Sequence, residues 1–170
     1  MTLRVIMAAL VLAVSGCAVP TSEKGWISPA NALETKLVEA ARSQSDVNYT
    51  AFSAELRNSK EVFVFIARRP HSDAEPIATW MPPIAGKQEI AIYTSRPRLE
   101  KSPHAAGGPV EWAGLNGGDV LQDAANCGYG VVVNYGLLPQ IEISPDEVVS
   151  VVREGGGSPV RPGNCRVLPN

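Results

Sequence analysis

Three cysteines and two histidines are the residues of this 170-residue chain best suited to chemistry. A cysteine thiolate is a nucleophile and a metal ligand, and the charge of histidine changes near neutral pH. The cysteines are Cys17, Cys127 and Cys165, and the histidines are His71 and His104. None of them stands at the spacing of a zinc site or in a nucleophile elbow. Each is therefore interpreted from the sequence around it.

Cys17 follows an apolar run from Val5 to Val14, and Arg4 is the only charge before it. The run is shorter than the ~20 apolar residues that span a bilayer, and residues 1–16 fit a secretory signal peptide. The residues Ala13-Val-Ser-Gly-Cys17 resemble the lipobox of bacterial lipoproteins. This resemblance implies cleavage before Cys17 and lipidation of its thiol and new amine. The alternative is a core cysteine in an N-terminal helix.

The lipobox resemblance also predicts the cellular localisation of the protein. Lipid on Cys17 would hold the chain on a bilayer, with residues 17–29 as a Pro-, Gly- and Ser-containing tether. Residue 18 is Ala, whereas Asp at this position retains many lipoproteins in the inner membrane. The resemblance therefore implies the periplasmic face of the outer membrane, with the inner membrane and the cell surface as alternatives.

Lipidation of Cys17 would leave one pair of cysteines in an oxidising compartment. We predict a disulfide between Cys127 and Cys165. Two unpaired thiols are the alternative. The stretch Cys127-Gly-Tyr-Gly130 is similar to a sulfur-transfer loop, but Val131 follows where such a loop needs an arginine.

Both histidines lie in loops rich in Pro, Gly and Ser. A Ser–His–Asp site can be assembled on paper from Ser95 or Ser102, either histidine, and Asp73. No Gly-x-Ser-x-Gly motif presents a serine. We therefore expect His71 and His104 to be solvated, and a small periplasmic hydrolase that uses one of them is the alternative function.

The remaining charges indicate neither a cofactor nor a nucleic-acid partner. The formal net charge is −2, and Arg68-Arg69 is the longest basic run, so the electrostatic pattern of nucleic-acid binding is missing. Asp119 and Asp123 stand four apart, which we interpret as a helix cap and a solvated face rather than a Ca²⁺ site. We predict no metal, no cofactor and no enzyme activity.

Hydrophobic spacing and capping signals predict an α/β (mixed α+β) fold with a single domain. We expect a mixed sheet of about five strands flanked by helices, over residues 30–153, with a Gly/Pro-rich tail at 154–170. The expected helices begin near Ser28, Tyr49, Ser95, Asp119 and, through a capping box, Ser144. The expected strands cover 61–67, 77–80, 89–93, 110–113, 129–135 and 140–143.

The order of these elements resembles the N-terminal domain of the SseB family. The resemblance rests on residues 61–67 (EVFVFIA), Ile92–Ser95 (IYTS), Gly117–Leu121 (GGDVL), Val131–Asn134 (VVVN) and Ser144–Glu147 (SPDE). Tyr135-Gly136 follows the Asn where the family often has Pro-Gly. The resemblance implies the fold and an interaction role linked to secretion systems or toxin immunity. It implies no catalytic residue.

We therefore expect a non-catalytic, membrane-tethered module that binds a protein. Rigid aromatic and proline side chains lose little entropy on binding. The contact surface expected from the sequence comprises Trp80, Met81, Pro82, Pro83 and Trp112.

Overall fold

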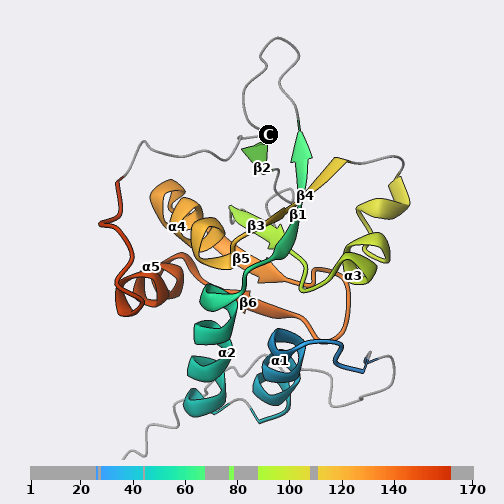
Figure 1. Ribbon diagram of the computed structural model, residues 1–170, viewed down its shortest axis with the longest axis horizontal. Coiled ribbons are helices and arrows are strands. Elements are labelled where there is room, and N and C mark those ends of the chain that lie inside the picture. The colour runs from blue at the N-terminus through green and yellow to red at the C-terminus, as the bar shows by residue number, and fades with distance from the viewer. Residues whose placement is uncertain are drawn as a thin grey trace, which may run out of the picture.

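The computed structural model describes residues 26, 28–43, 45–67, 77–78, 88–107 and 111–161. Helices precede, interrupt and follow the strands along this part of the chain (Figure 1). The helices are α1 (Ala32–Ser43), α2 (Asp46–Asn58), α3 (Arg96–Glu100), α4 (Gly117–Cys127) and α5 (Pro145–Glu154), with a 3₁₀ turn, η2 (Ala105–Gly107). The strands are β1 (Val62–Ala67), β2 (Ile77–Ala78), β3 (Glu89–Ile92), β4 (Glu111–Leu115), β5 (Gly130–Val133) and β6 (Ile141–Ile143).

The strands form two small sheets with the orders β2-β1-β4 and β3-β5-β6. All pairings are antiparallel except that of β3 with β5, which is parallel. One antiparallel bridge joins the sheets, through Phe63 N to Tyr93 O at 2.9 Å and Tyr93 N to Phe63 O at 2.8 Å. The mixed α+β class is thus confirmed, but the single sheet expected from the sequence is divided. The bend at Thr94 and Ser95 into α3 prevents pairing beyond Tyr93, and residues 89–92 of β3 pair with β5 instead of with β1.

Helix starts follow the capping signals in part. The capping box of α5 is confirmed, since Ser144 N donates to Glu147 Oε2 at 2.7 Å and Ser144 Oγ accepts from Glu147 N. The expected cap at Asp119 is wrong, because α4 begins earlier and Asn116 Oδ1 accepts from Gly118 N at 2.9 Å. Helix α1 also starts later than Ser28.

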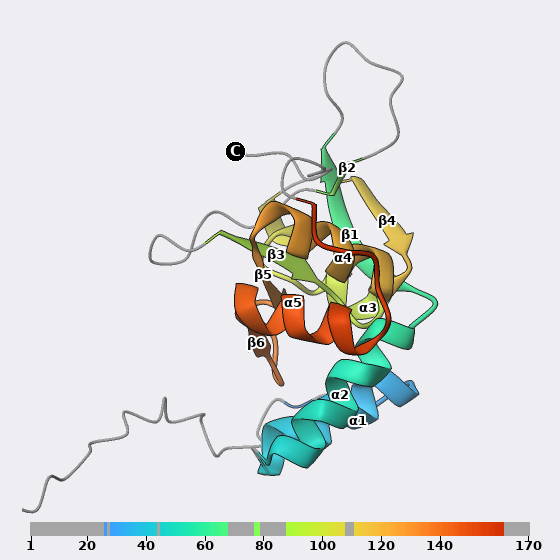
Figure 2. The same ribbon diagram turned by 90° about the vertical axis from the view of Figure 1, so that its left-hand side faces the viewer.

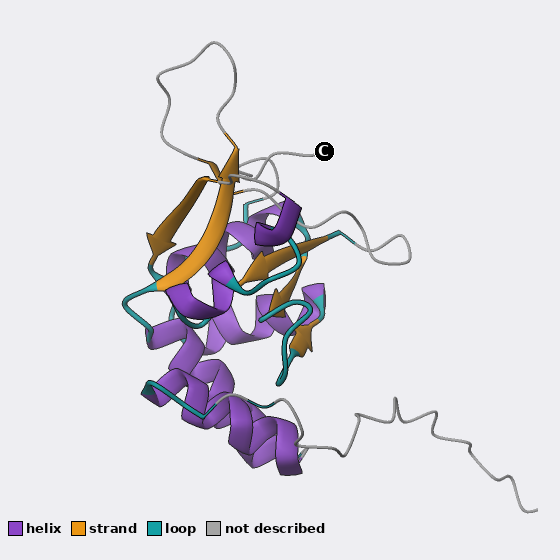
Figure 3. Ribbon diagram, turned by 90° about the vertical axis from the view of Figure 1, so that its right-hand side faces the viewer, coloured by secondary structure: helices purple, strands orange, loops and turns teal. Residues whose placement is uncertain are grey.

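The main core lies between the strands and the helices α1, α2, α4 and α5. Figure 2 shows the α1–α2 hairpin below α5 and α4, and Figure 3 shows the helices and strands packed into one body. The strand pattern fits this arrangement, since β3 and β5 are buried along their whole length. Buried core residues include Leu37, Phe52, Leu56, Val62, Val64, Ile90, Ile92, Leu121, Val131, Val133, Ile143 and Val148.

A second, smaller core covers the other face of the sheets. It comprises the buried residues Phe65, Ala91, Tyr93 and Leu99. Strand β1 therefore has apolar neighbours on both faces, as its uninterrupted apolar sequence predicts. Among the helices of the described ranges, none has the length and apolar character needed to cross a membrane.

Candidate functional site

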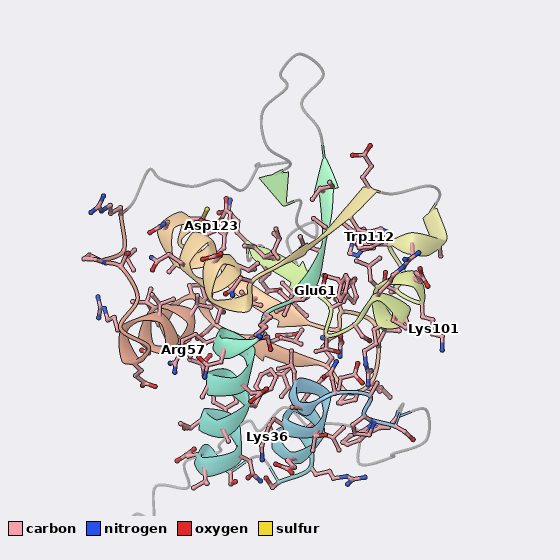
Figure 4. All side chains as sticks on the ribbon, in the orientation of Figure 1. Lys36, Arg57, Glu61, Lys101, Trp112 and Asp123 are labelled. Carbon is pink, nitrogen blue, oxygen red and sulfur yellow. The ribbon has the colours of Figure 1, made fainter. Side chains whose placement is uncertain are left out.

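Trp112 lies on β4 with 36% of its surface exposed. Its ring centroid is 5.6 Å from that of Phe63, and the Arg96 guanidinium carbon is 4.9 Å from the centroid of its indole ring. Figure 4 shows Trp112 beside α3, on the opposite side of the body from Arg57. We call Trp112, Phe63 and Arg96 the Trp112 surface.

Strand register explains why this tryptophan points away from the main core. Trp112 pairs with Phe65 and Gly114 pairs with Phe63, so these four residues share one face of the β1–β4 pair. Gly114 has no side chain, and the side chain of Glu61 lies where its Cβ would project. The edge position of β4 in its sheet leaves the indole at the surface.

An aromatic cluster beneath the Trp112 surface connects β1, β3 and the α3–η2 segment. Phe65 makes edge contacts with Tyr93 and His104 at centroid distances of 5.6 and 5.5 Å, and Tyr135 lies 5.4 Å from His104. The Tyr93 hydroxyl is 3.2 Å from Nδ1 of His104. The expectation that His104 is solvated is met only in part, because its ring is half-buried against these aromatics. Burial lowers the pKa of His104 and raises that of Tyr93.

Helix α3 is fastened to the body by a buried ion pair. Arg98 Nε donates to Glu34 Oε1 at 2.7 Å, and the two side chains are 2% and 1% exposed. Ser95 Oγ and Thr94 Oγ1 each donate to the same oxygen at 2.9 Å. Although burial acts to raise the pKa of Glu34, its hydrogen bonds to the Ala30 amide, Arg98, Ser95 and Thr94 together lower it.

Asn134 completes this polar network at the end of β5. It is fully buried with φ of 57°, a left-handed conformation that asparagine tolerates better than most residues. Its Oδ1 accepts from Thr94 N at 3.0 Å, and its Nδ2 donates to Thr94 Oγ1 at 3.1 Å. Arg98 Nη1 donates to the Leu138 carbonyl at 3.1 Å. The network, which we call the Glu34–Arg98 network, orders α3 and hence the position of Arg96 beside Trp112.

The sequence reasoning missed the Glu34–Arg98 network. A signal was present in the sequence. Leu37 and Val38 follow Glu34 by three and four residues, so Glu34 lies within the apolar stripe of α1. A charged residue inside such a stripe needs a buried partner of opposite charge. Which of the arginines supplies it could not be inferred from spacing.

Of the predicted contact residues, Trp112 alone lies within the described ranges. The residues outside them are Trp80, Met81, Pro82 and Pro83, together with Cys17, Cys165, His71 and Asp73. Cys127 is half-buried and disulfide-bonded. Because both other cysteines lie outside the described residues, the pairing with Cys165 stays a prediction.

The described residues do not bring a catalytic triad or a metal site together. His104 faces Tyr93, Phe65 and Tyr135, and Ser95 is hydrogen-bonded to Glu34. No three His, Cys, Asp or Glu residues gather as metal ligands in the parts of the chain that the structure covers. A triad with His71 and Asp73 stays an untested alternative.

Comparisons with known proteins give no match: no family model matches the chain, and searches of curated proteins and of solved structures find no significant similarity. The SseB resemblance and the lipobox therefore rest on the motifs alone.

Proposed function

We propose that this protein is a non-catalytic, membrane-tethered module that binds a protein partner through the Trp112 surface. The observation that carries the proposal is an exposed indole held in place by Phe63 beneath it and Arg96 beside it. Exposed tryptophan and arginine are enriched among residues that dominate the energy of protein interfaces.

Preorganisation supports this role. Binding costs free energy for each side chain that it immobilises, about 0.5–1.5 kcal/mol for a flexible one. The Trp112 ring already has a fixed neighbour on β1 and a cation–π contact with α3, so a partner would order little more. The Glu34–Arg98 network in turn limits movement of α3.

The proposed tether would keep this surface near a bilayer. The proposed tether runs from Cys17 to Trp26, and a flexible chain of about ten residues would span only tens of ångströms. Trp26 lies 5.5 Å from the guanidinium of Arg42 in the last turn of α1. Confinement of this kind raises the effective concentration of the module against partners that dock at the membrane.

The lipobox and SseB resemblances supply the setting of the proposal. Acylated Cys17 would anchor the protein to the periplasmic face of the outer membrane. The partner would be a component of a secretion system or a toxin that the module neutralises. Membrane binding is tested by Cys17→Ser: this variant should leave the membrane fraction and lose palmitate labelling, and retention of both would refute the anchor.

Site-specific photo-crosslinking tests partner binding. A photoreactive residue placed at position 112 of the full-length protein in native membranes should give a discrete protein adduct. Position 47 is the control, since Val47 is an exposed apolar residue with 76% exposure outside the Trp112 surface. Adducts of equal yield and pattern at both positions, or none at position 112, would refute the proposed surface.

A further inference from the structure

Residues of helices α2 and α5 line an open cavity of about 230 Å³. Both helices lie on the side of the body away from Trp112 (Figure 4). Each helix contributes lining residues, among them Asp46, Tyr49 and Ser53 from α2 and Glu147 and Glu154 from α5. The cavity shares no residue with the Trp112 surface, so its role is independent of the proposed function.

The charged residues that line this cavity are all acidic. The lining includes the carboxylates of Asp46, Glu147 and Glu154 and no basic residue. Within the described residues none of the three forms a salt bridge, although Glu147 Oε2 accepts from Ser144 in the capping box. The nearby Arg57 guanidinium donates instead to the carbonyl of Val151. A cation in the cavity would therefore meet three carboxylates that have no basic partner there.

Two buried hydroxyls provide a second, independent indication of a ligand. Ser53 lines the cavity with 5% of its surface exposed, and its Oγ has no hydrogen-bond partner in the structure. The hydroxyl of Tyr49 also lacks a partner, although Glu147 and Ser53 are close to it. Burial, followed by the charge of Glu147, raises the pKa of Tyr49, so this hydroxyl stays protonated. Unsatisfied buried hydroxyls are costly, and both can accept a hydrogen bond from an N–H donor.

The size and the arrangement of the carboxylates select the kind of cation. The described carboxylates do not cluster as ligands of a metal ion. A volume of about 230 Å³ is smaller than the ~300–1,000 Å³ of most small-molecule sites. We propose that this cavity binds a single ammonium or guanidinium group, with its alkyl stem against Val151 and its N–H groups directed to Glu147, Tyr49 and Ser53, in the negative field of Asp46 and Glu154.

Two sources can supply such a group: a free organic cation, or a lysine or arginine side chain of another protein. Three probes distinguish them: methylguanidinium, a blocked peptide with one central arginine, and the same peptide with citrulline in its place. Calorimetry on the full-length protein in non-ionic detergent measures affinity. Amide chemical shifts in α2 and α5 locate the binding. The citrulline peptide should bind at least tenfold more weakly than the arginine peptide, because it lacks the positive charge.

Two variants and a matched control test the site itself. The double variant Asp46→Asn, Glu154→Gln should weaken binding of the better probe about tenfold, since two of the three negative charges around the cation are lost. Ser53→Ala should weaken it with no loss of stability, because its hydroxyl has no partner in the free protein. The control is Glu39→Gln on α1, where Glu39 is an exposed carboxylate paired with Lys36, and it should bind as the wild type does.

The outcomes separate clearly. Tighter binding of the arginine peptide than of methylguanidinium supports a protein side chain as ligand, and the reverse order supports a free cation. The proposal is overturned if neither methylguanidinium nor the arginine peptide shifts the α2 and α5 amides at millimolar concentration. Unchanged affinity in the double variant also overturns it. Ca²⁺ binding at the same amides with higher affinity also overturns it, in favour of a metal site. None of these results alters the crosslinking expected at position 112.

Discussion

Arg96 and Arg98 stand two residues apart on the same short helix, yet they lie in opposite environments. Two helical residues at this spacing point roughly 200° apart. The Arg98 side chain is 2% exposed and bonded to Glu34, whereas that of Arg96 is 59% exposed and contacts Glu100 and Trp112. One residue type therefore stabilises the fold on the inner face of α3 and shapes a surface on the outer face.

The difference shows that burial, and not the presence of an ion pair, determines how much a charged residue contributes to the stability of the fold. Both arginines form a salt bridge with an N–O distance of 2.7 Å. Water screens the exposed pair, and such pairs contribute about 0–1 kcal/mol. Loss of one partner from a buried pair leaves an uncompensated charge in a medium that solvates it poorly.

Removing the buried guanidinium should have the largest effect on stability. Arg98→Met is expected to lower the free energy of unfolding by about 3–5 kcal/mol, since Glu34 would keep a buried charge with no cation beside it. Urea unfolding followed by circular dichroism measures the change. A loss below about 1 kcal/mol would contradict the distinction between the two faces of α3.

The control for this variant removes both charges. Arg98→Met combined with Glu34→Leu should recover most of the lost stability, because apolar replacement of a whole buried pair is often neutral. If the double variant is no more stable than Arg98→Met alone, the loss comes from packing or from the hydrogen bond of Arg98 to Leu138, and not from the unpaired charge.

Substitution of Asn134 should cause the second-largest loss of stability, because its side chain hydrogen-bonds within the same network and its backbone has a left-handed conformation. Asn134→Ala leaves the amide of Thr94 without its acceptor and places alanine at φ of 57°. An orphaned buried donor costs about 1–3 kcal/mol and a left-handed backbone about 1–2 kcal/mol. Asn134→Gly separates the two terms, since glycine tolerates this φ and should be about 1 kcal/mol more stable than alanine. Equal stability of the two variants in urea unfolding would exclude the backbone contribution.

The pH dependence of stability tests the charge on Glu34. Its pKa is lowered in the folded protein, so its charged form stabilises the fold above the unfolded-state pKa of about 4.3. This stability should be fully present above about pH 5 and lost as the pH falls through the folded-state pKa. In Glu34→Gln the corresponding slope should disappear from urea midpoints measured between pH 5 and 2.5. An unchanged slope would show that other carboxyls account for the acid sensitivity.

His104 contributes in a different pH window and can be separated from Glu34. Burial lowers its pKa, so the fold should lose stability as the pH falls below the unfolded-state value of about 6.5. Measuring the same midpoints in a His104→Gln background removes this component. The slope that remains below pH 5 then reports on the carboxyls.

The sequence was a good guide to the elements and a poor guide to what joins them. The capping box at Ser144 and the apolar strand at Val131–Val133 depend on neighbouring residues, and both have their predicted form. The division into two sheets depends on β3 pairing with β5 while only Tyr93, at its end, pairs with β1, and no residue type in β3 marks this choice. Local patterns therefore indicated the strands but not the point where their pairing stops.

The site shows the same limit for side chains. Trp112 could be singled out from its type and its place beside a loop, and the structure places it at the surface. The Glu34–Arg98 pair joins residues 64 positions apart, so no local pattern could identify the partner. His104 was expected in solvent because its loop is polar, yet long-range contacts with Phe65 and Tyr135 cover part of its ring.

The smallest effect on stability is expected for the exposed arginine. Arg96→Ala removes an exposed cation–π contact, worth about 0.5–1 kcal/mol, and an exposed i,i+4 ion pair, worth about 0.3–0.5 kcal/mol. These contributions are not fully additive, so we expect a total loss below about 1 kcal/mol in urea unfolding. Arg96→Lys keeps the charge but loses the planar group that stacks on the indole.

The main effect of Arg96→Ala should instead be on the partner. Without the guanidinium beside it, the Trp112 ring has one fixed neighbour fewer, and a partner has to order it on binding. The yield of the adduct formed from a photoreactive residue at position 61, whose exposed side chain lies over Gly114 on the face of Trp112, should therefore fall in both Arg96 variants while their stability stays near that of the wild type. A loss of stability as large as that of Arg98→Met would show that the outer face of α3 contributes to the fold as the inner face does, and would contradict the comparison. Unchanged stability with unchanged crosslinking would leave the Trp112 ring positioned by Phe63 alone.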